Sequence, residues 1–224
     1  MKRQWIDYSG FSLRRLNEPR FKHLKLLAGW IFYFAMYFIT ENLIPPESCH
    51  PMHCALDDLI PFNEVFVIFY VGWYVLVVGA LLYTMFTDTQ NFSRVQTYIF
   101  ITQVFAMTIY VMWPSRQDLR PEVFPRENAL TALMAFIYSF DTNTGVCPSL
   151  HVAYSMGILS TALRDKNFPG WGKALLIVLV ALICCAVCFV KQHSALDVIG
   201  ALPICIMAEI LTFYVFFPYE KETE

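Results

Sequence analysis

Charged side chains are scarce in this chain: they make up 15% of its 224 residues, against 57% for hydrophobic residues. The formal net charge is −2, and such a near-neutral balance argues against a nucleic-acid partner. The sequence also lacks internal repeats, low-complexity stretches and linkers. We therefore expect one domain across residues 1–224, without a second core outside the apolar segments.

The hydrophobic residues gather in runs, most of which have about the 20 residues that a helix needs to cross a bilayer. The expected spans lie near residues 24–44, 64–86, 97–114, 149–163, 174–190 and 195–217. The fourth and fifth runs are short, and they can cross if flanking residues snorkel or if the bilayer is locally thin. The sequence therefore predicts an all-α fold, an integral membrane bundle of six transmembrane helices.

Basic residues are distributed unevenly between the connections, and this asymmetry predicts the orientation. With a cytoplasmic N-terminus, the inner segments hold 12 lysines and arginines, and the outer segments hold Arg116, Arg120, Arg126 and Lys191. An even number of spans returns the C-terminus, so both termini are expected in the cytoplasm. The lead-in of residues 1–23 is too charged for a secretory signal peptide, so the first run should stay as an anchor. We expect a multi-pass protein of the plasma membrane.

Two short polar islands interrupt the apolar sequence, each at the expected outer end of a span. The first is Pro-Ser-Leu-His at residues 148–151, and the second, residues 191–197, contains His193 and Asp197. Ionisable residues are costly in a membrane and therefore mark candidate functional sites. The longest polar connection, 115–148, leads directly into the first island, and loops of that length without their own core are usually functional.

The second island has a spacing that suits nucleophilic chemistry. His193 and Asp197 are four residues apart, so on a helix they share a face and the carboxylate can approach one imidazole nitrogen. That hydrogen bond would fix the tautomer of the ring. The other nitrogen would then be free to attack an electrophile, while Asp197 stabilises the developing positive charge.

Residues that could bind a phosphate occur at the first island and in the outer loop. Ser149 and Leu150 begin a span, where unpaired N–H groups and the helix dipole attract an anion. His151, in the same turn, would protonate a leaving oxygen and later take a proton from the acceptor. Cationic side chains would complement the oxygens of a phosphoryl transition state. The candidates for that role are Arg120, with Arg116 or Lys191 assisting.

These islands resemble the second and third signatures of the type 2 phosphatidic acid phosphatase superfamily, P-S-G-H and S-R-x5-H-x3-D, which are carried on a six-helix membrane bundle. Residues 148–151 match the former except at Leu150, and residues 193–197 match the end of the latter. Arg120, followed by a proline, is similar to the end of the first signature, K-x6-R-P. The resemblance covers the span arrangement from about residue 64 onward.

The resemblance implies a role for each matching residue. In the superfamily the third-signature histidine is the nucleophile, its aspartate orients it and the second-signature histidine is the general acid, which corresponds to His193, Asp197 and His151. Arg120 would bind phosphate. The implied activity is that of a lipid phosphatase, which hydrolyses a lipid phosphate or pyrophosphate at the outer face through a phosphohistidine intermediate and without a metal.

The pattern departs from the superfamily at the phosphate-binding positions. The third-signature serine and arginine fall at Ala186 and Val187, and the first-signature lysine falls at Trp113. Loss of that arginine with retention of H-x3-D resembles the inositol phosphorylceramide and sphingomyelin synthase branch, which moves a head group between lipids. A lipid head-group phosphotransferase is therefore the alternative function, and either enzyme would have a lipid phosphate as its partner in the bilayer.

A membrane transporter is the least favoured function. A transporter should place polar groups near mid-membrane and often shows inverted repeats. Here the spans are mostly uncharged between their ends, apart from Glu209, and no repeat is visible. Glu209 is expected to pack with a polar neighbour in the bundle.

Residues 49–54, Cys-His-Pro-Met-His-Cys, contain four potential metal ligands within six residues. Ligands packed so closely rarely surround a tetrahedral ion, so no metal is predicted, and no cofactor either. A disulfide between Cys49 and Cys54 is expected instead, because the outer face is the more oxidising one. Cys147 lies on the same face, so the three cysteines cannot all pair within one chain.

Overall fold

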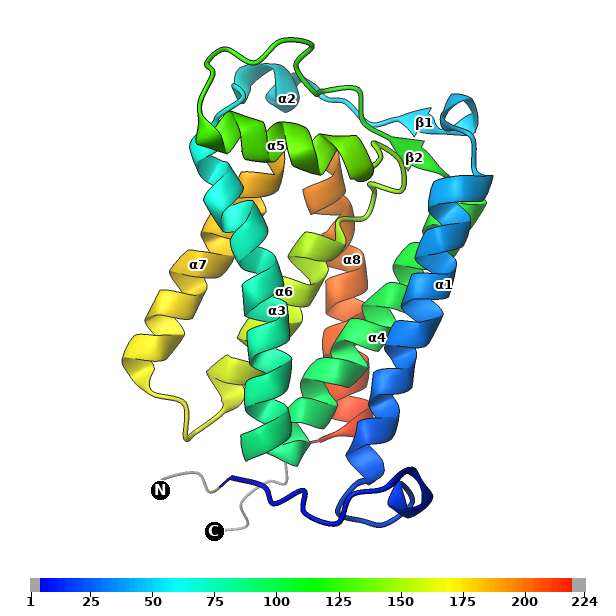
Figure 1. Ribbon diagram of the computed structural model, residues 1–224, viewed down its shortest axis with the longest axis vertical. Coiled ribbons are helices and arrows are strands. Elements are labelled where there is room, and N and C mark those ends of the chain that lie inside the picture. The colour runs from blue at the N-terminus through cyan, green and yellow to red at the C-terminus, as the bar shows by residue number, and fades with distance from the viewer. Residues whose placement is uncertain (1–4, 219–224) are drawn as a thin grey trace.

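The computed structural model describes residues 5–218, and its long helices run side by side along one axis (Figure 1). Five helical segments are long and apolar enough to cross a membrane, which confirms the predicted helical membrane class: Lys22–Leu43, Glu64–Thr87, Thr89–Met112, Gly170–Phe189 and Ala195–Phe216. The helices in these segments are α1 (Ala28–Leu43), α3 (Val67–Thr87), α4 (Thr89–Met112), α7 (Gly170–Phe189) and α8 (Ala195–Ile210), which continues as a π-helix over Leu211–Phe216.

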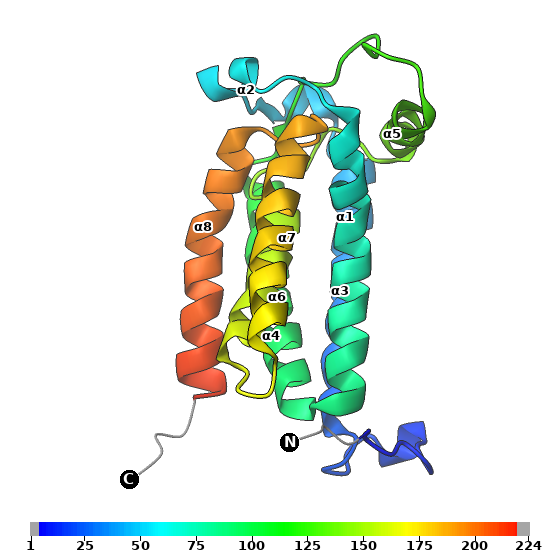
Figure 2. The ribbon, with the colours of Figure 1, turned by 90° about the vertical axis from the view of Figure 1, so that its left-hand side faces the viewer.

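Helix α6 (Leu150–Arg164) is a further long helix and lies inside the bundle (Figure 2). It packs against α4, α7, α8 and α3, and more than half of its residues are buried. Its 15 residues correspond to about 22 Å at the helical rise. That length is below the roughly 30 Å of a hydrocarbon core. Helix α6 is therefore shorter than the five segments that are long enough to span a membrane. The fourth predicted span coincides with it in sequence.

Helix α4 begins earlier than the apolar run near 97–114 predicts. The side chain of Asp88 accepts hydrogen bonds from the N–H groups of Gln90 and Asn91, which caps the helix at its observed start. The polar side chains of Asn91, Ser93, Arg94 and Gln96 follow in the first two turns and are buried. The 3₁₀ helix Lys22–Leu27 contacts α4, and Nε1 of Trp30 donates to Oε1 of Gln96 at 3.2 Å. Contacts within the protein therefore accommodate polar side chains that the hydrophobicity of the sequence did not place in a span.

The connections that the sequence predicts to be outer form a folded layer over one end of the bundle (Figure 1). This layer and this end of the bundle are called the outer layer and the outer end below, and the opposite end is called the inner end. The first connection contains strand β1 (His50–Pro51) and helix α2 (Ala55–Leu59), and the second contains strand β2 (Ser115–Arg116) and helix α5 (Ala129–Phe140). Strands β1 and β2 pair in parallel, with His50 opposite Ser115. At the opposite end, 3₁₀ helices over Leu13–Arg15 and Lys22–Leu27 precede α1.

Helix α5 lies across the end of the bundle and was not expected in the connection 115–148 (Figures 1 and 2). Asn128 caps its first turn by accepting the N–H groups of Leu130 and Thr131. Met134 and Ile137 are buried in a second core cluster with residues of α3 and α7. This packing anchors the connection and fixes Asp141, which follows the last helical residue.

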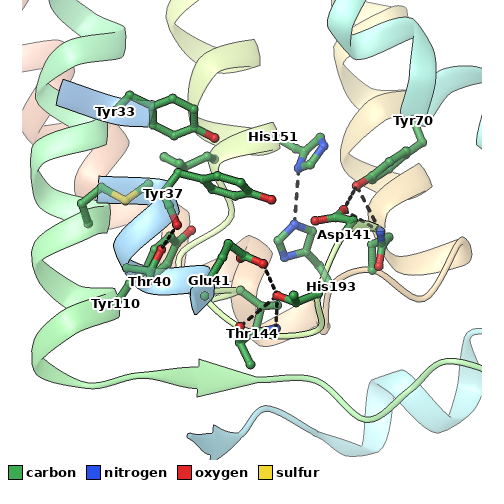
Figure 3. Close-up of a pocket in the computed structure, with 16 residues that line it drawn as sticks. Tyr33, Tyr37, Thr40, Glu41, Tyr70, Tyr110, Asp141, Thr144, His151 and His193 are labelled. Atoms are coloured by element: carbon green, nitrogen blue, oxygen red, sulfur yellow. Dashed lines mark hydrogen bonds between the residues drawn. The ribbon is translucent and has the colours of Figure 1, made fainter. Parts of the chain in front are cut away.

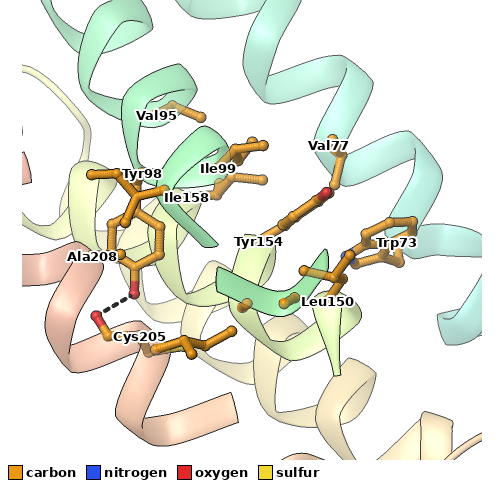
Figure 4. Packing of buried hydrophobic residues seen from close by; sticks show 14 of the residues in the cluster. Trp73, Val77, Val95, Tyr98, Ile99, Leu150, Tyr154, Ile158, Cys205 and Ala208 are labelled. Carbon is orange, nitrogen blue, oxygen red and sulfur yellow. Dashed lines mark hydrogen bonds between the residues drawn. The ribbon is translucent and has the colours of Figure 1, made fainter. Parts of the chain in front are cut away.

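The main hydrophobic core lies between α3, α4, α6, α7 and α8 (Figure 4). Tyr98 of α4 is 1% exposed, and its hydroxyl donates to the carbonyl of Cys205 on α8 at 3.1 Å. Gly157 of α6 faces the same ring, because a Cβ added there would lie 2.4 Å from Cδ1 of Tyr98. The close approach of α4 and α6 therefore depends on the absence of a side chain at Gly157.

Gly157→Ala is expected to destabilise the protein by about 1–3 kcal/mol, because the Tyr98 ring would have to leave its packed position. Equilibrium unfolding in detergent would measure the change. Gly79→Ala on α3 is the matched control, since a Cβ there meets nothing within 4 Å. Equal unfolding midpoints for the two variants would contradict the packing argument.

The expected disulfide between Cys49 and Cys54 is absent, because both cysteines are free, as is Cys147. The Cys49 thiol donates to the carbonyl of Pro45 at 3.7 Å. Cys54 is the residue before α2, and its N–H donates to the carboxylate of Asp57 at 2.8 Å. Hydrogen bonding within the outer layer thus replaces the predicted cross-link.

Candidate active site

His151 and His193 lie together at the outer end of the bundle, although 42 residues separate them (Figure 3). Nε2 of His193 is 3.4 Å from Nδ1 of His151. The ring centroids are 5.4 Å apart and the ring planes make an angle of 69°. His151 is in the first turn of α6 and His193 follows α7, so the α6–α7 hairpin brings the two islands together.

Asp197, in the first turn of α8, holds the other side of the His193 ring. Its Oδ2 lies 3.2 Å from Nδ1 of His193 and also accepts the N–H of Ser194 at 2.9 Å. The carboxylate is fully buried. When Nδ1 carries the proton toward this carboxylate, Nε2 is left as the unprotonated nitrogen and faces His151.

Asp57 of α2 anchors the connection that carries His193. Its Oδ2 accepts the hydroxyl of Ser194 at 2.5 Å, and its Oδ1 accepts the N–H of Ala195 at 2.8 Å. Burial acts to raise the pKa of Asp57, but these hydrogen bonds outweigh it and hold the pKa below its usual value. Asp57 and Ser194 are 137 residues apart, so no local pattern could have identified this contact from the sequence.

Lys191 does not reach the histidine pair. Its ammonium donates to the carbonyls of Asp57 at 2.9 Å and Ile60 at 2.5 Å, and the residue is 8% exposed. Its backbone has φ +53, a left-handed conformation that turns the chain out of α7. Lys191 therefore ties the α7–α8 connection to the outer layer and does not line the cavity beside the histidines.

Arg120 donates hydrogen bonds to residues next to the site, but it does not line the cavity. Its Nη2 donates to Oε1 of Gln192 at 2.6 Å and to the carbonyls of Asp141 at 2.9 Å and Thr142 at 2.7 Å. Its guanidinium also lies 4.5 Å from the ring centre of Tyr138. In this structure Arg120 holds the end of α5 against the α7–α8 connection, and burial lowers its pKa.

The two remaining outer arginines also have protein partners. Arg116 donates to the carboxylate of Asp118 at 2.9 Å and to the carbonyl of Pro46 at 2.8 Å. Arg126 forms a bidentate pair with Glu64, with both distances 2.7 Å. The structure therefore does not bring Arg116 or Arg126 to the histidines.

Ser149 and Leu150 differ in their relation to the site. The N–H of Ser149 donates to the carbonyl of Asp197 at 3.0 Å, so it joins the two islands and is not free to bind an anion. The Ser149 hydroxyl is buried and has no hydrogen-bond partner. Leu150 begins α6 and lines the cavity beside the histidines.

A cavity of about 80 Å³ opens beside the histidine pair (Figure 3). This space suits a small polar group and not a whole lipid. Among the described residues that line it there is no lysine or arginine. Its ionisable and aromatic lining residues are Tyr33, Tyr37, Glu41, Tyr70, Tyr110, Asp141, His151 and His193.

A larger groove of about 380 Å³ continues from this cavity between α1 and α3. The two spaces share Tyr33, Tyr37, Asp141, Leu150 and His151. A third space of about 340 Å³ carries the groove toward the inner end of the bundle. The groove walls are mainly apolar and aromatic and include Trp30, Phe34, Trp73, Val77, Val78, Leu81 and Met85.

Within residues 5–218, no group of three or more histidine, cysteine or acidic side chains is placed to hold a metal ion. Comparisons with protein-family models, with curated proteins and with solved structures found no match for this chain. The likeness to a family therefore depends on the two islands, on Arg120 with the proline after it, and on the span arrangement.

Proposed function

We propose that the protein is a membrane enzyme that transfers a phosphoryl group from a lipid through a covalent intermediate on His193. The observation that carries this proposal is the row formed by Asp197, His193 and His151, with successive distances of 3.2 and 3.4 Å, beside a cavity. A carboxylate-held imidazole is an activated nucleophile. A second imidazole next to it is placed for acid–base catalysis.

The reaction would take two steps. In the first, Nε2 of His193 attacks phosphorus, the bond to the lipid oxygen breaks, and that oxygen receives a proton from His151. In the second, His151 takes a proton from the acceptor, whose oxygen attacks the phosphohistidine and releases His193. Asp197 stabilises the imidazolium that forms in the first step.

The two histidines must separate when a substrate binds. Phosphorus has to approach Nε2 of His193 to about 3–3.5 Å before reaction. That distance equals the whole 3.4 Å between the facing nitrogens. Since in-line transfer places nucleophile and acid on opposite sides of phosphorus, the observed contact corresponds to a site without substrate.

The proposal includes the topology. Helix α6 would complete six spans, because a short helix in the bundle centre can be matched by local thinning of the bilayer. The bias of basic residues would then place both termini in the cytoplasm and the histidines at the non-cytoplasmic face of the plasma membrane. Three of the inner basic residues, Lys2, Arg3 and Lys221, lie outside the described residues.

Hydrolysis is the leading reaction, with water as the acceptor and a lipid phosphate or pyrophosphate as the substrate. Head-group transfer to a lipid alcohol is the second candidate, and one observation favours it. The described lining of the cavity contains Glu41 and Asp141 but no lysine or arginine. A phosphate monoester carries about two negative charges, and nearby carboxylates would repel it.

A panel of lipids would test the proposed function and separate its two forms. Purified protein in detergent is incubated with phosphatidic acid, an isoprenoid pyrophosphate and phosphodiester lipids, with and without a lipid alcohol. Released phosphate and new lipid products are both measured. We expect product from at least one lipid, and none from His193→Ala. Product formation that is equal in His193→Ala and wild type would contradict the proposal.

A further inference from the structure

Helix α5 has no charged residue among its 12 positions, although it belongs to the polar outer layer. Its buried side consists of Thr131, Met134 and Ile137. Its exposed side carries large apolar residues at intervals of three and four, which therefore share one face of the helix: Leu133, Phe136 and Phe140, called the α5 stripe below. The rings of Phe136 and Phe140 have centroids 5.3 Å apart. A helix that is apolar on both sides requires an apolar environment on both sides.

Helix α5 lies at the level where the membrane-crossing segments end. It contacts α3 and the 3₁₀ helix Glu64–Phe66, which begins the segment Glu64–Thr87 that is long enough to cross a membrane. Figure 2 shows α5 end-on, beyond the edge of the bundle on the side of α1 and α3 and level with the outermost turns of α3. Helix α5 therefore projects sideways from the bundle at the depth of a membrane interface.

The chemistry of the α5 stripe suits the apolar part of a lipid leaflet. Large exposed apolar patches mark contacts with membranes or proteins, and a helix in the interface plane buries its apolar side roughly 5–10 Å into the boundary between head groups and acyl chains. Two phenyl rings and a leucine carry no charge and no hydrogen-bonding group. A contact of this kind does not depend on salt or on the charge of the lipid.

The protein side of α5 is hydrogen-bonded to the connection that carries His193. The hydroxyl of Tyr138 donates to the carbonyl of Val190 at 2.5 Å. Asp141, which follows the last residue of α5, accepts the amide of Gln192 at 2.8 Å and lines the groove between α1 and α3. In Figure 1, α5 runs from the outer end of α3 toward the outer end of α1, across the outer end of this groove. The position of α5 therefore determines the positions of both the connection and the mouth of the groove.

We propose that α5 inserts the α5 stripe into the leaflet at the outer end of the bundle and holds the connection of His193 and the mouth of the groove at the bilayer surface. The partner is the acyl-chain region of that leaflet, whatever the charge of its head groups. The lipid contact goes beyond the proposed function, and only its effect on turnover rests on that function.

Labelling of introduced thiols tests the lipid contact without turnover. Phe136→Cys, Leu59→Cys and Val75→Cys are each placed in phosphatidylcholine nanodiscs, one protein per disc, and treated with a hydrophilic maleimide. The three native side chains are 65%, 78% and 71% exposed in the protein alone, so only lipid distinguishes the positions. Leu59 ends α2, which lies farther out than α5 in Figure 1, and Val75 is in the middle of α3. Mass spectrometry of the peptides separates these thiols from the native cysteines.

Phe136→Cys should react about tenfold more slowly than Leu59→Cys, because the thiolate is the form that attacks the reagent and lipid disfavours that charged form. Val75→Cys gives the rate of a position that faces lipid. The ratio should not change with added salt or with anionic lipid in the disc. Phe140→Cys repeats the test at a second position of the stripe.

Equal labelling rates for Phe136→Cys and Leu59→Cys would overturn the lipid contact, whether or not the protein is active. Protection that appears only with two proteins per disc would also overturn it, because the α5 stripe would then belong to an interface between two copies of this chain. If Phe136→Cys is protected while wild type cleaves no lipid, the proposed function fails and the lipid contact stands.

Turnover tests the coupling between the α5 stripe and the site. Phe136→Ser combined with Phe140→Ser should lower product formation several-fold when enzyme and lipid substrate share a bilayer. In detergent micelles, which present lipid to the groove without a bilayer surface, the same variant should stay near wild type. Leu59→Ser makes a matched change at an exposed position of α2 and should behave as wild type in both media. Equal losses in bilayer and detergent would indicate a structural role of the stripe and overturn the coupling.

Discussion

His193→Ala is expected to abolish both turnover and the phosphoenzyme, with a loss of roughly 10³-fold or more, because removal of a covalent nucleophile leaves little of the original mechanism. Replacing His151 with alanine should have a different effect. The nucleophile with its Asp197 partner remains in that variant, so a substrate with a good leaving group can still phosphorylate His193. The intermediate should then accumulate, because no base activates the acceptor.

Acid-labile, base-stable radiolabel on the protein distinguishes these outcomes, since this is the stability of a phosphorus–nitrogen bond. The matched control is His50→Ala, because His50 belongs to the outer layer and stacks on Trp113 with ring centroids 4.9 Å apart, away from the histidine pair. It should keep wild-type turnover. Label on a residue other than His193, or full activity of His193→Ala, would rule out the proposed nucleophile.

Asp197→Asn is expected to lower turnover by about 10²–10⁴-fold while the protein stays folded. Oδ2 of Asp197 accepts the N–H of Ser194 at 2.9 Å and also lies 3.2 Å from Nδ1 of His193, so an amide group satisfies only one of the two contacts. With its NH₂ group at this place, the amide donates to Nδ1, the ring proton moves to Nε2, and the nitrogen that should attack phosphorus lacks its lone pair. With its oxygen there, the tautomer is kept but the negative charge that stabilises the imidazolium is lost.

The measurement is turnover over a range of pH, together with the unfolding midpoint. Asp118→Asn makes the same change in an exposed residue that pairs with Arg116, and it should lower neither quantity appreciably. Unchanged turnover of Asp197→Asn would show that the carboxylate does not control the tautomer. A large fall in the unfolding midpoint would instead assign Asp197 a role in holding the start of α8.

Short-range patterns in the sequence predicted the features that depend on neighbouring residues. The four-residue spacing of His193 and Asp197 predicts their contact, and the structure places the two side chains 3.2 Å apart, although His193 precedes the N-cap Ser194 and only Asp197 lies in α8. Glu209 has the expected polar neighbours, since it pairs with Arg164 and accepts the hydroxyl of Ser160 at 2.6 Å. The long apolar runs likewise correspond to long helices, because length and composition are local properties.

Features that depend on long-range contacts were not predictable in this way. Lys191 and Arg120 have the charge that a phosphate site needs, but carbonyl and amide oxygens from distant segments take up their donors. Glu41 and Asp141 belong to no recognisable motif. They line one cavity only because the end of α1 and the end of α5 lie close together beside the histidines. An acidic residue near the end of a span is ordinarily read as interfacial, so their shared cavity has no signature in the sequence.

The groove between α1 and α3 has a kinetic consequence. A substrate that enters along it would arrive by diffusion within the bilayer, so the rate would follow the mole fraction of that lipid in the membrane and not its bulk concentration. Adding inert lipid at constant substrate would then slow the enzyme. A head group that has been detached from its chains would forfeit the apolar contacts of Trp30, Phe34 and Val77. Such a soluble product would compete poorly with intact lipid and would leave the site readily after each cycle.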